Sequence, residues 1–350
     1  MIALANHLPR IRVPWVPIGR WPTPLTALDI AGRRVWVKHE GDAHPGYGGN
    51  KIRTLEVWFG HAQARGARRI WAIGAYGSNH AIATVLHAPL AGLEAAAMLF
   101  PQPHSAWAIE NCGALVASGC PLLRLRSVVG VPFAAWRVAR RERDAIVMPP
   151  GGATPIGTFG ALAAAFELAD QIAAQLAPPP QRIVVPAGST CTAAGLLAGL
   201  ALARAIGVWR WPLPVVHGVR VTPWPVTSRL RTADLARRTL VRIEQLGGPP
   251  VPIGLGELLG HLVIDGRELG RGYGRSTPRC DAAMREISGP RLDAVYSGKA
   301  AAALLRLLRA GAGPLMFWAS KSTATLPPPS DEAVRNTHPA LARWLGRGTA

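Results

Sequence analysis

Short apolar runs alternate with longer amphipathic segments along most of this chain. Compact or alternating runs predict β-strands over residues 34–38, 69–73, 95–100, 122–125, 182–186, 215–221, 293–296 and 315–318. Helical periodicity predicts helices over residues 50–64, 80–91, 105–118, 193–206 and 299–309. Because a helix that connects two strands normally places them side by side in parallel, the pattern predicts an α/β fold with mostly parallel sheets.

The order of these elements predicts two units, each with its own sheet. With 350 residues the chain is long enough for two cores, and the Pro-rich run 177–180 is typical of a connector. We expect two three-layer α/β/α domains, a small one of residues 50–160 and a large one of residues 1–49 plus 161–350. The apolar run 193–209 contains Arg204 and three glycines. It predicts a buried helix rather than a membrane span.

Charge and cysteine usage narrow the classes of function. The formal net charge is +19, which would suit a nucleic-acid binder. The arginines, however, form short groups without interleaved aromatic residues or a recognised binding motif, so an arginine-biased composition is the favoured explanation. The four cysteines lack metal-ligand spacing, and the N-terminus lacks a secretory pattern. We therefore expect a cytoplasmic protein with no metal site, no nucleic-acid partner and no membrane partner.

Lysine is rare in this chain, and one lysine stands in an unusual setting. Of 39 basic residues only four are lysines: Lys38, Lys51, Lys299 and Lys321. Lys51 follows two glycines and an asparagine at the start of a predicted helix. An amine can form an imine with an aldehyde, whereas a guanidinium cannot usefully do so. The first hypothesis is that Lys51 carries pyridoxal phosphate (PLP) as a Schiff base.

Three other groups of residues supply what such a cofactor needs, although each also has an ordinary structural explanation. Gly188-Ser189-Thr190-Cys191-Thr192 lies between a predicted strand and a predicted helix, where backbone N–H groups can bind a phosphate. Ser78-Asn79-His80 occupies a similar junction and suits a substrate carboxylate, but the same residues can simply cap a helix. Tyr273 and Tyr296 lie next to glycine or Ser-Gly and can move a proton or contact a planar ring.

Together and in this order, these motifs resemble those of the 1-aminocyclopropane-1-carboxylate deaminase and D-cysteine desulfhydrase family. The most specific string is Gly48-Gly49-Asn50-Lys51-Ile52-Arg53-Thr54-Leu55-Glu56. The resemblance implies the tryptophan synthase β-like fold, called fold type II, with PLP in the cleft between the domains. Relatives in this family are commonly homodimers.

The resemblance also implies a role for each candidate residue. Lys51 holds the cofactor and Asn79 lies against its ring hydroxyl. Ser320 meets the pyridine nitrogen, and the phosphate lies in the loop of Gly188, Ser189, Thr190, Cys191 and Thr192. The substrate contacts Ser78, Asn79, His80 and Tyr296, and the catalytic residues are Lys51, Ser78, Tyr273 and Tyr296.

Three departures from the family pattern bear on activity. The loop after the last strand reads Ala319-Ser320-Lys321-Ser322, where the family usually has His-Thr-Gly-Gly, so Lys321 brings bulk and charge beside the cofactor or reshapes the loop. Ser297 replaces the glutamate of the deaminases, which favours elimination over opening of a cyclopropane ring. Thr190-Cys191 stands where close relatives usually have a glycine, and Cys191 either crowds the phosphate or packs.

The expected activity is release of ammonia and a 2-oxo acid from a small amino acid. The favoured reaction is β-elimination of a D-cysteine-like substrate to pyruvate, ammonia and sulfide. One alternative is conversion of 1-aminocyclopropane-1-carboxylate to 2-oxobutanoate and ammonia. Another alternative is a divergent PLP-binding protein with little turnover.

Overall fold

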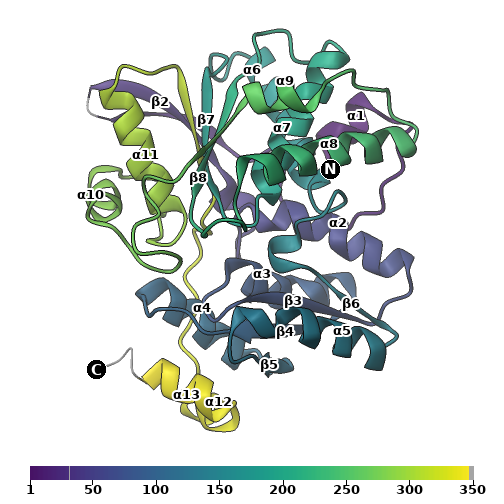
Figure 1. Cartoon of the computed structure of the whole chain (residues 1–350), viewed down its shortest axis with the longest axis vertical. Helices are drawn as coiled ribbons and strands as arrows, with labels where there is room; N and C mark the ends of the chain where they lie inside the picture. The colour runs from purple at the N-terminus through teal and green to yellow at the C-terminus, as the bar shows by residue number, and fades with distance from the viewer. Residues whose placement is uncertain (31, 347–350) are drawn as a thin grey trace.

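The computed structural model describes residues 1–30 and 32–346 and contains two β-sheets (Figure 1). The larger sheet has six strands in the order β1-β2-β10-β7-β8-β9. Strand β1 is antiparallel to β2, and the remaining pairs are parallel. The strands are β1 (Leu25–Ile30), β2 (Arg33–His39), β7 (Arg182–Ala187), β8 (Val215–Arg220), β9 (Leu262–Asp265) and β10 (Leu315–Ala319).

The smaller sheet has four parallel strands in the order β5-β4-β3-β6. It lies below the larger sheet in the view of Figure 1. The strands are β3 (Arg69–Ala75), β4 (Glu94–Phe100), β5 (Leu122–Arg124) and β6 (Ala145–Val147). The predicted α/β class with mostly parallel sheets is therefore confirmed.

Helices cover both faces of the larger sheet. One layer packs around α6 and α7, and the other is formed by α10 and α11. Along β10, Met316 and Trp318 belong to the core under α6 and α7, whereas Phe317 belongs to the core under α11. This two-residue alternation of buried side chains is typical of a strand covered on both faces. The helices are α1 (Ile2–His7), α6 (Phe159–Ala173), α7 (Cys191–Ala205), α8 (Arg229–Gln245), α9 (Leu255–Gly260), α10 (Pro278–Glu286) and α11 (Ser297–Arg309).

The smaller sheet is covered in the same way. Ile70 and Ala72 of β3 join a core shared with α2, α3 and α4, while Trp71 and Ile73 join the core under α5. The helices here are α2 (Lys51–Ala64), α3 (Asn79–His87), α4 (Ala106–Ala117) and α5 (Val131–Arg141), with the short 3-10 helices η2 (Ala88–Ala91), η3 (Val128–Gly130) and η4 (Pro150–Gly152). A further 3-10 helix, η1 (Glu40–Ala43), follows β2 of the larger sheet.

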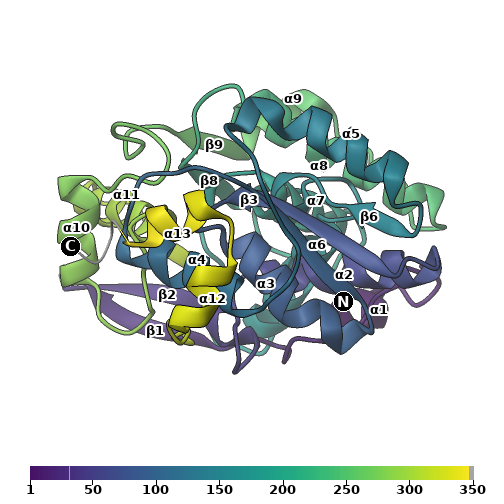
Figure 2. The ribbon, with the colours of Figure 1, turned by 90° about the horizontal axis from the view of Figure 1, so that it is seen from below.

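The C-terminal segment crosses from one sheet to the other. After β10 it runs past α4 to α12 (Asp331–Asn336) and α13 (Pro339–Gly346), which lie beside α4 (Figures 1 and 2). The indole of Trp344 donates to the carbonyl of Gln102 at 3.0 Å and stacks on His104 with ring centroids 4.4 Å apart. The domain boundaries at residues 49/50 and 160/161 stay a prediction.

Most of the predicted elements are confirmed, and one is wrong. Residues 293–296 form a turn rather than a strand. The carboxylate of Asp293 accepts the backbone N–H groups of Val295 at 2.9 Å and of Tyr296 at 2.7 Å, which favours a turn over extended pairing. Helix α11 consequently begins at Ser297, before the predicted start at Lys299. The buried helix predicted from residue 193 is present as α7, and no helix in the described part of the chain is long and apolar enough to cross a membrane.

A buried ionic network joins the start of α2 to the larger sheet. The guanidinium of Arg53 donates to Glu40 at 2.6 Å and to Glu167 at 2.8 Å, and the Lys38 ammonium lies 2.5 Å from Glu167. All four side chains are buried. Burial alone would raise the pKa of Glu167, but the charges of Arg53 and Lys38 lower this pKa to about 2. The network holds α2, η1, β2 and α6 together.

Glu167→Gln should lower the free energy of unfolding by about 3 kcal/mol, because it leaves two buried cations incompletely paired. Denaturant titration measures this change. The matched control is Asp29→Asn, which breaks the exposed pair with Arg34 and should cost less than about 1 kcal/mol.

Because the folded pKa of Glu167 is depressed, its contribution is complete above the ordinary value of 4.5 and is lost as the pH falls through about 2. The wild-type protein should therefore lose more stability than Glu167→Gln over that interval. Equal losses of unfolding free energy in Glu167→Gln and Asp29→Asn would contradict the stabilising role of the network.

Candidate active site

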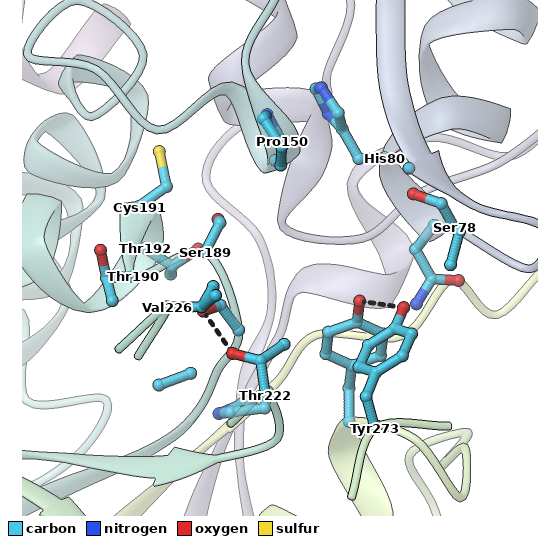
Figure 3. Close-up of a pocket in the computed structure, with 18 of the residues that line it drawn as sticks. Ser78, His80, Pro150, Ser189, Thr190, Cys191, Thr192, Thr222, Val226 and Tyr273 are labelled. Atoms are coloured by element: carbon cyan, nitrogen blue, oxygen red, sulfur yellow. Dashed lines mark hydrogen bonds between the residues drawn. The ribbon is translucent and has the colours of Figure 1, made fainter. Parts of the chain in front are cut away.

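A cavity of about 320 Å³ lies where the carboxyl ends of strands from both sheets approach each other. All of the predicted site residues line it: Lys51, Ser78, Asn79, His80, Gly188, Ser189, Thr190, Cys191, Thr192, Tyr273, Tyr296 and Ser320. In Figure 3 the loop of Ser189 to Thr192 lies on one side, with Ser78 and His80 on the opposite side. The structure thus brings together residues that are far apart in the sequence.

Lys51 is the first residue of α2, and tight loop packing positions it. A Cβ on Gly48 would lie 2.0 Å from the carbonyl oxygen of Gly41, and one on Gly49 would lie 2.8 Å from that of Ser320. Gly49 also has φ +100, a conformation that glycine adopts readily. The two glycines therefore let the chain before α2 lie directly against neighbouring backbone.

The amine of Lys51 makes only a weak hydrogen bond within the described residues. Its hydrogen bond is donated to the carbonyl of Gly151 at 3.4 Å, which is long. Burial lowers the pKa of this amine, with Cys191 opposing the shift. A lowered pKa makes this amine easier to deprotonate, and the deprotonated amine is the form that attacks a carbonyl carbon.

The opposite wall is the start of α7, which is suited to bind an anion. Thr190 precedes the helix with φ +71, and its buried hydroxyl has no partner within the described residues. Thr192 accepts a hydrogen bond from the side-chain amide of Asn50 at 2.8 Å. The free N–H groups of the first helical turn add positive potential. An unpaired buried hydroxyl beside a helix start fits a phosphate group.

Cys191 packs and does not hold a charge. Its sulfur lies 3.8 Å from the hydroxyl of Thr54 and 3.7 Å from the carbonyl of Gly152. Burial raises the pKa of this thiol, so it stays protonated at neutral pH. Of the two outcomes expected for this residue, the structure supports packing.

The third wall carries the Ser78-Asn79-His80 motif at the start of α3. The Ser78 hydroxyl caps the helix by accepting the N–H of Ala81 at 3.2 Å, so the ordinary structural role is present as well. His80 is buried, and neither ring nitrogen has a hydrogen-bond partner in the part of the chain that is described. Burial, aided by the charge of Lys51, lowers the pKa of His80 to about 3. A neutral, unpaired imidazole beside a helix start is available to a ligand.

Tyr273 and Tyr296 form a hydrogen-bonded pair at the cavity wall. Their hydroxyl oxygens are 2.8 Å apart, and their rings meet edge to face (Figure 3). Burial raises the pKa of Tyr273 to about 12 and that of Tyr296 well above its ordinary value. Both are neutral phenols at physiological pH, and a Cβ on Gly188 would lie 3.2 Å from the ring of Tyr296.

The departures from the family pattern have distinct places in the structure. Ser320 lines the cavity, whereas Lys321 and Ser297 do not. The hydroxyl of Ser297 donates to Asp293 at 3.0 Å and is fully buried. The ammonium of Lys321 donates to the side-chain oxygen of Asn79 at 3.3 Å. Lys321 thus lies behind the cavity wall and contacts one of the lining residues.

Several cavity residues were missed by the sequence analysis. Gly151 belongs to the run Pro149-Pro150-Gly151-Gly152, and a Cβ there would lie 2.2 Å from the hydroxyl of Ser189. The Pro/Gly cluster was a usable signal for this loop. The other lining residues that were not assigned to the site come from the carboxyl ends of strands, the starts of helices, loops and 3-10 helices: Asn50, Ile73, Gly74, Ala75, Phe100, Val128, Pro150, Pro186, Ala187, Ala193, Thr222, Pro223 and Val226.

These features define a class of site: a buried lysine amine that faces a helix-start anion cradle, between parallel α/β layers. The unpaired hydroxyl of Thr190 and the unpaired ring of His80 show that the polar groups present fit a phosphorylated aldehyde and an amino-acid carboxylate. This is the arrangement of a PLP-dependent enzyme of fold type II.

Comparison with known proteins agrees with this class. Residues 16–314 match the family model described as pyridoxal-phosphate dependent enzyme. The chain therefore belongs to that family, and its cofactor is pyridoxal phosphate. The resemblance stated from the sequence is confirmed.

Individual relatives differ in the activity their names describe. Nocardicin C-9' epimerase of Nocardia uniformis subsp. tsuyamanensis is 34% identical over 89% of this chain and 93% of its own length. D-cysteine desulfhydrase of Yersinia pestis (strain Pestoides F) is 29% identical over 81% of this chain and 84% of its own length. A crystal structure of an ACC deaminase homologue aligns with a TM-score of 0.74 at 28% identity, covering 93% of this chain and 96% of that one.

Thr190→Val should weaken the affinity for PLP by about tenfold, because it removes a hydroxyl that the protein leaves free for an anion. The free energy of unfolding of the cofactor-free protein should not fall through loss of a hydrogen bond, since the hydroxyl has no partner there. Fluorescence titration with PLP measures the affinity. The control Thr190→Ser keeps the hydroxyl and should bind nearly as well as the wild type; equal weakening in both variants would contradict the assignment.

Proposed function

We propose that this protein removes the α-proton of a small amino acid and expels a substituent from the β-carbon, with D-cysteine as the favoured substrate. D-cysteine and water would give pyruvate, ammonia and hydrogen sulfide. The observation that supports this proposal is one cavity that combines a buried amine, an anion cradle and a neutral polar wall. The D-cysteine desulfhydrase relative supports the choice of substrate.

Each wall of the cavity has one task in this proposal. Gly188 to Thr192 would hold the phosphate, Asn79 would bind the ring oxygen, and Ser320 would bind the ring nitrogen. The substrate carboxylate docks on the N–H groups and side chains of Ser78, Asn79 and His80. When bound, PLP supplies an electron sink for the charge left on the α-carbon.

The chain's own groups carry the proton transfers. The amine of Lys51, whose pKa is lowered by burial, takes the α-proton when it is unprotonated. Tyr296 and Tyr273 share a hydrogen bond and are both protonated, so either hydroxyl can donate a proton to the departing thiolate. Neutral His80 adds a polar contact for the carboxylate without introducing a charge.

The chemistry of the walls favours elimination over ring opening. Among residues 1–30 and 32–346, no carboxylate lines the cavity, and Ser320 is a neutral partner for the ring nitrogen. Without a nearby negative charge that nitrogen has less tendency to be protonated, which makes a weaker electron sink. Expelling a thiolate needs less stabilisation than breaking a cyclopropane ring. Deamination of 1-aminocyclopropane-1-carboxylate is therefore the less favoured alternative.

A second candidate function is epimerisation of an amino-acid centre. The epimerase relative covers most of this chain, and epimerisation begins with the same proton removal. Lys51 of α2 and Ser78 before α3 approach the cavity from different elements, which suits removal of a proton at one face and its return at another.

A homodimer and a cytoplasmic location are proposals that rest on the family resemblance and the cysteine usage. For a protein that binds PLP but has diverged from the rest of the family, little catalytic turnover is expected.

Incubating the protein and PLP with D- and L-cysteine, serine and 1-aminocyclopropane-1-carboxylate in heavy water separates these candidates. The proposal predicts pyruvate and sulfide from D-cysteine, with at least about tenfold lower kcat/KM for the cyclopropane substrate. Inversion with α-deuterium incorporation and no 2-oxo acid would instead support epimerisation. Lys51→Ala should abolish both 2-oxo acid release and exchange, and Lys51→Ala with wild-type turnover would contradict every version.

A further inference from the structure

Lys321 is a buried cation without a carboxylate partner. Its side chain is 2% exposed, and no acidic group of the described residues lies within ion-pair distance of its ammonium. The ammonium lies 5.5 Å from the ring centroid of Tyr47 and 5.7 Å from that of Trp107. Contacts with two aromatic faces stabilise a cation but do not fully replace lost hydration. Because burial of this charge is not fully compensated by the protein, we expect its contacts to indicate a function for Lys321.

The polar atom that the ammonium contacts belongs to a cavity residue. Lys321 donates to the side-chain oxygen of Asn79 at 3.3 Å. The same oxygen accepts from the hydroxyl of Tyr47 at 2.9 Å and from the amide of Asn111 at 2.8 Å. Three donors on one oxygen fix the orientation of the Asn79 amide, since the flipped amide would point N–H groups at an ammonium.

The other end of the amide is left for a ligand. Asn79 lines the cavity, and its side-chain nitrogen has no acceptor in the part of the protein that is described. An amide whose oxygen is bound by a cation is polarised, so its N–H groups become stronger donors.

We propose that Lys321 is a positioning residue that acts on the cofactor through Asn79, strengthening the hydrogen bond from Asn79 to the ring oxygen of bound PLP and favouring the anionic form of that oxygen. The inference rests on the assignment of Asn79 to the ring oxygen, and it does not depend on which substrate is used. The family pattern that this chain resembles has glycine at this position, so this chain adds a charge behind the cavity wall.

The charges around Lys321 do not cancel its effect on Asn79. Burial lowers the pKa of Lys321, while Asp293 and Glu110 raise it and Arg291 lowers it. Glu110 is paired with Arg291 at 2.9 Å, and Asp293 accepts backbone N–H groups of the turn before α11. Tyr47, the remaining titratable group that faces the ammonium, is a neutral phenol because burial raises its pKa.

The cavity side offers no competing negative charge. Burial leaves the ring of His80 neutral and the phenols of Tyr273 and Tyr296 protonated, and Lys51 is the residue proposed to bind the cofactor. A positive charge near the cofactor opposes protonation of the cofactor. Loss of the Lys321 charge should therefore raise the pH at which the bound cofactor loses a proton.

Lys321→Met tests the inference, because it keeps an unbranched side chain and removes the charge. The pH at which the visible absorption of bound PLP changes should rise by about one unit. The affinity for PLP should fall by about tenfold. Neither measurement requires turnover, so PLP uptake without lyase activity would overturn the proposed function and leave this inference standing.

Tyr47→Phe is the matched control. It removes the Tyr47 hydroxyl, which donates to the same oxygen of Asn79 at 2.9 Å, a shorter distance than the 3.3 Å from Lys321. The substitution leaves the charge of the protein unchanged. Its effects on affinity and on the absorption change should be clearly smaller than those of Lys321→Met. Equal effects of the two substitutions would show a structural role only and would overturn the inference, as would a Lys321→Met protein that matches the wild type in both measurements.

If the visible absorption of PLP bound to the wild type does not change over the pH range in which the protein is folded, the test rests on the PLP affinities. The affinities of Lys321→Met and Tyr47→Phe are then each compared with that of the wild type. A wild-type protein that takes up no PLP would overturn this inference together with the cofactor assignment.

Discussion

The position of Lys51 depends on a constraint two residues further along α2. Arg53 lies buried between Glu40 and Glu167, and Lys38 shares Glu167 with it. These four charges come from α2, η1, α6 and β2, so the first turn of α2 is fixed to the larger sheet while the rest of the helix packs on the smaller one. A buried charge that loses its partner is costly, which gives this turn little freedom to shift. The amine of Lys51 is consequently held at the junction of the two layers, opposite the start of α7. Gly160 of α6 supports the same junction, because a Cβ there would lie 1.9 Å from the carbonyl oxygen of Arg53.

The cavity itself is built from ends of parallel strands and starts of helices. Such junctions leave backbone N–H groups free, and two side chains with unpaired buried polar atoms, those of Thr190 and His80, lie at two of them. The lining groups are mostly neutral: the phenols of Tyr273 and Tyr296 are protonated and His80 is uncharged. A lysine, Lys321, lies behind the walls, where it contacts Asn79. The net charge of +19 therefore says little about the site, since the arginines lie mostly outside it.

Much of the fold and the centre of the site were predictable from the sequence. Strand and helix patterns are local, and the scarcity of lysine singled out Lys51 before any contact was known. Other features were not predictable because they depend on contacts between distant segments. Residues 293–296 are apolar enough for a strand, but the Asp293 carboxylate binds the following N–H groups and forms a turn. The direction of the Lys321 side chain follows from Tyr47, Asn79 and Trp107, which come from three separate segments. Short strands such as β6 and β9 carry little signal of their own and form through pairing with β3 and β8.

In this protein we infer that the amine of Lys51 is the group that binds PLP. Borohydride reduction of the holoprotein, followed by proteolysis and peptide mass spectrometry, locates the modified lysine directly. The chain offers four lysines, so the experiment has four distinct positive outcomes. The account predicts a phosphopyridoxyl group on the peptide that contains Lys51, with the peptides of Lys38, Lys299 and Lys321 unmodified. Modification of any of those three in place of Lys51 would contradict it.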